Sequence, residues 1–136
     1  MNSLVPLTAI VATVGFSPSP VPAGLSPSEV SATAQVYDPD STLLAEARFD
    51  AGDDAFTLVG RVAADRPYLN YRYVRVDGSV QTGTHWGATG AGTPATFHHH
   101  FGTGRTVTFR VCVSGQHLFN PCSGTDSGEN WTVAIA

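Results

Sequence analysis

The chain has 136 residues, of which 42% are hydrophobic and only 13% are charged, so we expect one packed domain and exclude disorder driven by charge. Seven arginines and no lysine stand against eleven acidic residues, and the net charge of -4 excludes a basic face for nucleic acid. No apolar run reaches the roughly 18 to 20 residues of a bilayer span, so we expect no membrane span.

We expect residues 1–28 to form an apolar arm and a Pro-rich linker. Leu4–Phe16 has the length of a signal-peptide core and Ala23 could precede a cleavage site, but Met1–Ser3 holds no Lys or Arg. Two interpretations stay open: a signal peptide removed after Ala23, or a retained arm whose strand Leu7–Phe16 joins the sandwich or pairs with a neighbour. The candidate interface residues of a retained arm are Leu7, Ile10, Val14 and Phe16.

Residues 29–136 predict an antiparallel β-protein. Apolar and polar residues alternate, and Gly or Pro recurs roughly every ten residues, which is typical of a sandwich or barrel. The expected strands are Val30–Tyr37, Leu43–Phe49, Phe56–Ala63, Tyr68–Val76, Ser79–Trp86, Ala95–Phe101, Thr106–Ser114 and Trp131–Ala136. With Leu7–Phe16, the chain has about nine strands.

Two of these strands have clear apolar faces. In the second strand, alternation places Leu43, Ala45, Ala47 and Phe49 on one face, with Leu44, Glu46 and Arg48 opposite. In Thr106–Ser114, the expected inward residues are Val107, Phe109, Val111 and Val113. These inward sets predict the centre of the core.

The Asp77-Gly78 pair predicts a β-hairpin. It lies between two alternating runs, Tyr68–Val76 and Ser79–Trp86. A two-residue type I′ turn needs positive φ at both positions, which Asp and Gly tolerate. We therefore expect these two strands to pair directly.

Cys112 and Cys122 lie ten residues apart, with Gly115, Asn120 and Pro121 between them. The spacing fits two strands joined by a hairpin loop, across which a disulfide is geometrically reasonable. The alternative is two reduced thiols, one in a strand and one in a loop. A disulfide would mean that the protein matures or works in an oxidising compartment.

The histidines are the candidate metal ligands. Strand alternation puts His98 and His100 on one face and leaves His99 on the other, together with Phe97 and Phe101. Imidazoles at i and i+2 can chelate, but zinc needs further ligands, for which His85, His117 or an acid would have to converge. The alternatives are an exposed polar face or histidine packing at a subunit contact. We predict no bound cofactor.

The tyrosines form a candidate aromatic surface with Trp86. Alternation places Tyr71 and Tyr73 on one face of their strand and Tyr68 on the other. Such residues can form a platform for a sugar ring, but we favour core packing or a protein interface. Tyr71, Tyr73 and Trp86 are therefore candidate interface residues.

The short strands, the hairpin, the Cys112/Cys122 pair near the last two strands and the closing WTVAIA segment resemble an immunoglobulin-like sandwich. The Lys-free composition, rich in Ala, Thr, Gly and Val, resembles small surface proteins of high-GC actinobacteria and the Ig-like accessory proteins of their phages. The resemblance covers residues 29–136 and implies a structural or binding role. We expect an all-β fold: an antiparallel immunoglobulin-like β-sandwich over 29–136, with residues 1–28 as an N-terminal extended arm or added strand.

No catalytic pattern stands out. Ser114-Gly115 lacks the nucleophile elbow, and the acids are few and mostly on turns. We therefore expect no enzyme activity but a structural or binding module that docks on a larger protein assembly or forms a homo-oligomer, as a virion decoration or accessory protein of a phage. The alternative is a small secreted bacterial Ig-like binding domain with a cleaved signal peptide. The expected location is the virion or the extracellular space.

Overall fold

A computed structural model of the chain describes residues 29–136, which are all-β and contain no helix. The strands are β1 (Ala32–Tyr37), β2 (Leu43–Asp50), β3 (Ala55–Gly60), β4 (Arg66–Val74), β5 (Val80–Trp86), β6 (Pro94–His98), β7 (Thr106–Ser114) and β8 (Thr132–Ile135). Each strand predicted within this part of the chain forms, with small shifts at the ends. The predicted strand Leu7–Phe16 and the 1–28 arm lie outside the described residues.

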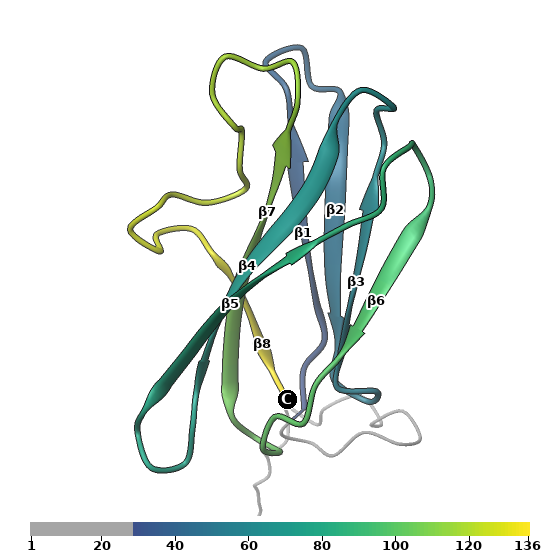
Figure 1. Cartoon of the computed structure of the whole chain (residues 1–136). Helices are drawn as coiled ribbons and strands as arrows, with labels where there is room; N and C mark the ends of the chain where they lie inside the picture. The colour runs from purple at the N-terminus through teal and green to yellow at the C-terminus, as the bar shows by residue number, and fades with distance from the viewer. Residues whose placement is uncertain (1–28) are drawn as a thin grey trace, which may run out of the picture.

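The strands form two four-stranded antiparallel sheets that pack face to face (Figure 1). One sheet has the order β1-β2-β3-β6 and the other has the order β5-β4-β7-β8. The predicted β-sandwich is therefore confirmed. Among residues 29–136, no helix is long and apolar enough to cross a membrane.

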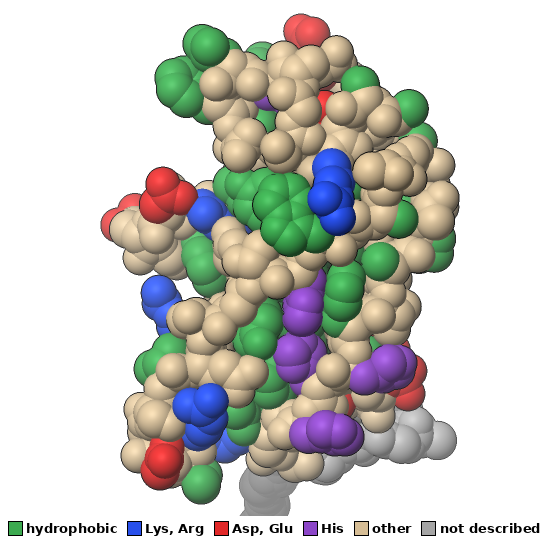
Figure 2. Space-filling view, in the orientation of Figure 1, with side chains coloured by type: hydrophobic (Ala, Val, Ile, Leu, Met, Phe, Trp, Pro, Cys, Tyr) green, Lys and Arg blue, Asp and Glu red, His purple; other side chains and the backbone are tan. Residues whose placement is uncertain are grey.

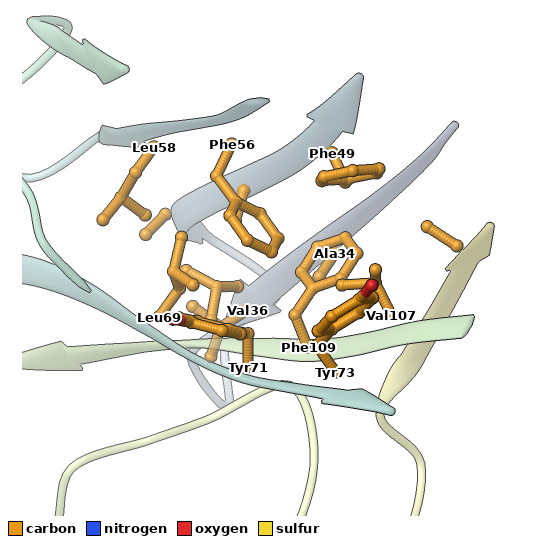
Figure 3. Close-up of a cluster of buried hydrophobic side chains, with 14 of the residues drawn as sticks. Ala34, Val36, Phe49, Phe56, Leu58, Leu69, Tyr71, Tyr73, Val107 and Phe109 are labelled. Atoms are coloured by element: carbon orange, nitrogen blue, oxygen red, sulfur yellow. The ribbon is translucent and has the colours of Figure 1, made fainter. Parts of the chain in front are cut away.

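The core fills the space between the two sheets. The predicted inward residues of β7, Val107, Phe109, Val111 and Val113, are each fully buried. Figure 3 shows further inward side chains of both sheets: Ala34, Val36, Phe49, Phe56, Leu58, Leu69, Tyr71 and Tyr73. Each fully buried Val, Leu or Phe stabilises the fold by about 1.5–3 kcal/mol, so this layer holds the sheets together.

The start of β2 departs from simple alternation. Val36 pairs with Ala45 but Tyr37 pairs with Leu43, so the register shifts by one residue. The extra residue, Leu44, is buried, which contradicts its predicted outward position. A β-bulge lets two residues of one strand oppose one of its partner and re-aims a side chain.

The predicted hairpin pairs β4 with β5, beginning at Val74 opposite Val80. Its loop differs from the predicted two-residue type I′ turn. Arg75 N–H donates to the Ser79 carbonyl (2.8 Å), and Gly78 N–H donates to the Arg75 carbonyl (2.9 Å). Only Gly78 has positive φ in this loop, at 87°. This is the three-residue loop in which a type I turn is followed by a left-handed glycine.

The structure joins Cys112 and Cys122 in a disulfide, as one of the two interpretations of their spacing predicted. Cys112 lies in β7, and Cys122 forms an isolated antiparallel bridge beside it. Two backbone hydrogen bonds flank the link, from Val113 N–H to the Pro121 carbonyl and from Ser123 N–H to the Val111 carbonyl. The disulfide therefore fastens the long β7–β8 loop to the edge of the sheet.

Candidate functional site

An aromatic stack lies on the outer face of the β5-β4-β7-β8 sheet. Tyr68 of β4 pairs in register with Trp86 of β5, and their ring centroids lie 4.5 Å apart. The Arg66 guanidinium carbon lies 5.0 Å from the centroid of the Trp86 ring. Alternation explains the arrangement, because Leu69 and Tyr71 of the same strand face the core and leave Tyr68 outside.

The β7–β8 loop exposes two apolar side chains. Leu118 and Phe119 are 91% and 80% exposed. Their neighbour Asn120 donates a hydrogen bond to the Tyr68 hydroxyl (3.4 Å), which connects the loop to the stack. We call Arg66, Tyr68, Trp86, Leu118 and Phe119 the aromatic patch.

The same loop is also fixed at its base. His117 Nε2 lies 2.9 Å from the carboxylate of Asp65, a residue that is only 2% exposed. A side chain at Gly115 would place its Cβ 2.6 Å from Asp65 Oδ1, so this close approach requires glycine. Together with the disulfide, these contacts attach the base of the loop to the sandwich, and the loop projects beside β7 (Figure 1).

Further along the sheet, a second aromatic residue is flanked by arginines. The guanidinium carbons of Arg72 and Arg110 lie 5.5 Å and 5.3 Å from the centroid of the Trp131 ring. Trp131 Nε1–H donates to the Thr125 carbonyl (2.7 Å), and Arg110 forms an ion pair with Asp126 (2.9 Å). These contacts order the end of the β7–β8 loop.

A pair of histidines lies where β5 and β6, the edge strands of opposite sheets, face each other. The Nε2 atoms of His85 and His99 are 2.8 Å apart. His85 stacks on Phe97 with a centroid distance of 4.3 Å, and His99 stacks on Phe101 at 4.4 Å. We call His85 and His99 the histidine pair. Figure 2 shows histidine side chains in a column between hydrophobic side chains on this side of the molecule.

The predicted alternation around β6 explains why His99, one member of the histidine pair, points inward. His98 and His100 are exposed, whereas Phe97 and His99 are half-buried and Phe101 is buried. Asp54 fixes the segment after β6, because its carbonyl accepts from His99 N–H (2.8 Å) and its carboxylate accepts from Phe101 N–H (2.6 Å). Burial raises the pKa of the Asp54 carboxyl.

Both rings of the histidine pair have perturbed acidity. Burial lowers the pKa of His85, and burial together with the neighbouring His85 and His100 lowers the pKa of His99 to about 4. Both imidazoles are therefore neutral at neutral pH, and one N–H donates to the lone pair of the other ring.

Two hollows lie elsewhere on the described surface. The larger, of about 440 Å³, is lined by Tyr73, Arg75, Val76, Gln81, His100, Gly102, Thr103 and Arg105. The smaller, of about 270 Å³, is lined by Thr33, Glu46, Arg48, Thr57 and Val59 on the outer face of the other sheet. Neither hollow contains the aromatic patch or the histidine pair.

Of the interface residues predicted from the sequence, the structure buries some and exposes others. Tyr71 and Tyr73 are 6% and 7% exposed, so they belong to the core and not to a surface platform. Trp86 is 44% exposed and keeps its place as a surface candidate. The arm residues Leu7, Ile10, Val14 and Phe16 lie outside the described part of the chain.

The predicted metal ligands His98 and His100 are both exposed. Within residues 29–136, no group of three or more His, Cys, Asp or Glu converges on one point. The structure instead pairs His85, which the sequence suggested as a converging ligand, with His99. Leu118 and Phe119 were not predicted as surface residues, because two adjacent apolar residues in a loop carry no local signal of exposure.

Comparisons of the chain with protein-family models, curated proteins and solved structures find no match.

Proposed function

We propose that this protein is a non-enzymatic binding module that docks on a larger protein assembly through the aromatic patch. The observation that carries the proposal is the exposure of Leu118 and Phe119, 91% and 80%, on a loop whose Asn120 is hydrogen-bonded to Tyr68 of the stack. Covering a large apolar side chain contributes about 1.5–3 kcal/mol to association, so this patch favours a partner surface.

The chemistry of the patch favours a protein partner over a sugar. Trp, Tyr, Phe and Arg are the residues enriched at the centres of protein interfaces. The Arg66 guanidinium over the Trp86 ring and the Tyr68 ring beside it reduce the aromatic surface left for a sugar. The disulfide and the Asn120–Tyr68 bond fix the patch before binding, which reduces the entropy lost on association.

The immunoglobulin-like classification is part of the proposal. Its support is the pair of packed four-stranded antiparallel sheets and the chain crossings between them. In immunoglobulin domains strand B lies beside strand E, whereas here β3 lies between β2 and β6. Other sandwich domains share the architecture with altered strand order, and we place this module among them.

The proposed assembly is a phage particle, on which the module serves as a decoration or accessory protein. The disulfide is consistent with an extracellular location. A small secreted bacterial binding domain would use the same disulfide but would lack residues 1–23. Intact mass of the native protein separates the two, because a mass beginning near Gly24 supports the secreted domain.

The test of docking compares two double variants in particles purified from the native source. Leu118→Ser with Phe119→Ser removes the apolar part of the patch, while Val76→Ser with Val80→Ser alters exposed valines on the hairpin, 86% and 51% exposed. We expect wild type and the valine variant to sediment with the particle, and the patch variant to stay at monomer size with unchanged melting temperature.

Two results would contradict this function. One is sedimentation of the patch variant with the particle at the wild-type level. The other is a homo-oligomer of the purified wild-type protein that forms through the patch. The patch would then serve self-association and not docking on a different assembly.

A further inference from the structure

We propose that His85 and His99 bind a divalent transition-metal ion, with Zn²⁺ as the reference ion, through their Nε2 atoms. Such an ion would link β5 of one sheet to the segment after β6 of the other, across the open side of the sandwich. This inference is independent of docking through the aromatic patch.

The distance between the two nitrogens is close to what a metal requires. They lie 2.8 Å apart, with the ring planes inclined by 52°. Two Zn–N bonds of about 2.0–2.1 Å at a tetrahedral angle place the nitrogens about 3.3 Å apart, so the rings need to separate by only about 0.5 Å. The two edge strands belong to different sheets and share no ladder hydrogen bonds, so no β-pairing has to break for the rings to separate.

Aromatic packing already orients both rings toward the point between them. His85 is stacked on Phe97 and lies nearly parallel to Tyr71, at 17°. His99 is stacked on Phe101, with an interplanar angle of 12°. The two rings are therefore already ordered before an ion binds. The ring that donates its Nε2 proton in the hydrogen bond has to adopt the Nδ1–H tautomer, which frees its Nε2 lone pair for the ion.

The donor set limits the kind of ion and its affinity. Imidazole suits Zn²⁺, Ni²⁺ and Cu²⁺, whereas Mg²⁺ and Ca²⁺ prefer oxygen ligands. Since no third His, Cys, Asp or Glu of residues 29–136 joins the pair, at least two positions remain for water or a ligand brought by another molecule. We therefore expect weaker binding than at a closed four-ligand site.

The exposed histidines of the same segment provide a matched control. His98 and His100 flank His99, belong to the same residue type and are both exposed. They are also the pair that the sequence predicts as ligands. Replacing them changes the number of histidines without touching the two facing Nε2 atoms.

The test is titration of the full chain, stripped of metal by chelator, with Zn²⁺ in a calorimeter. We expect one ion per chain, affinity reduced at least about tenfold by His85→Gln or His99→Gln, and affinity unchanged by His98→Gln with His100→Gln. Magnesium should give no heat of binding. Absence of zinc binding, or loss of binding in the His98/His100 variant alone, would overturn the proposal.

A second measurement uses only the wild-type protein, so it does not depend on the folding of variants. Long-range ¹H–¹⁵N spectra of the imidazole rings report which nitrogen binds the ion. We expect the Nε2 signals of His85 and His99 to shift on addition of Zn²⁺, with both rings as the Nδ1–H tautomer. Unchanged signals of this pair would contradict the site.

Discussion

At the residue scale, Phe56 is the centre of the aromatic core. Its ring centroid lies 5.0 Å from that of Phe49, 5.3 Å from that of Phe109 and 5.6 Å from that of Tyr71. It also touches His99, at 5.6 Å. The core and the histidine pair are therefore packed against the same side chain.

The same substitution at two phenylalanines should have very different effects. Phe56→Ala leaves a cavity in a fully buried position, and we expect it to lower the free energy of unfolding by about 3–5 kcal/mol. Phe119→Ala, at an 80% exposed position, should change it by less than about 0.5 kcal/mol. Denaturant unfolding measures both, and a large loss at Phe119 would show that this ring supports the fold.

Glu46 gives a prediction for pH. Its carboxylate accepts hydrogen bonds from Gln35 (2.8 Å) and Arg61 (2.8 Å), which lower the pKa of this group. A carboxyl whose pKa is lower in the folded state adds stability above its unfolded value, and that stability is lost as pH falls through the folded pKa.

We therefore expect Glu46→Gln to lower the free energy of unfolding by about 0.2–1 kcal/mol at pH 7, and the difference from wild type to shrink as the pH falls below the ordinary Glu pKa of about 4.3. Thermal unfolding across this range measures it. The exposed Glu129→Gln is the control and should match wild type throughout. An effect of Glu46→Gln that is equal at pH 7 and pH 3 would contradict the role given to its charge.

At the element scale, the sequence predicts strands well and their junctions poorly. Alternation identified all the strands of residues 29–136, because each strand has one face in the core. The bulge at Leu44 could not be predicted, since it depends on the register against β1. The loop at Gly78 was predicted as a hairpin but with the wrong turn, because a local Asp-Gly pair fits more than one loop length.

For the candidate sites too, the sequence predicts what depends on one strand and misses what depends on how two elements meet. The face shared by Phe97, His99 and Phe101 was predicted, because it is a property of one strand. The meeting of His99 with His85 was not, because it depends on how the edges of two sheets lie against each other. Tyr71 and Tyr73 point inward for a similar reason, since the second sheet covers them.

The disulfide is the element-scale feature most open to test. It links two residues ten positions apart in the sequence, and such a link stabilises a fold by about 2–4 kcal/mol. We expect Cys112→Ala with Cys122→Ala to lower the melting temperature and to make the loop containing Leu118 and Phe119 more sensitive to protease. A reducing agent should reproduce the effect in wild type and add nothing in the variant. Equal stability of variant and wild type would contradict the role of the link in fixing the patch.

At the scale of the whole molecule, the two outer faces differ. The outer face of the β5-β4-β7-β8 sheet carries Trp86 and Trp131 with their stacked arginines, and the β7–β8 loop projects beside it. The outer face of the other sheet carries the polar network of Gln35, Glu46 and Arg61. The proposed docking uses the face that carries the two tryptophans.

The most direct test of docking is photo-crosslinking within the native particle. A photoreactive phenylalanine analogue replaces Phe119 in one sample and the similarly exposed hairpin residue Val76 in another, 80% and 86% exposed. Docking through the aromatic patch predicts a single covalent product between position 119 and one particle protein, with none from position 76. No product from position 119, or the same products from both positions, would contradict it.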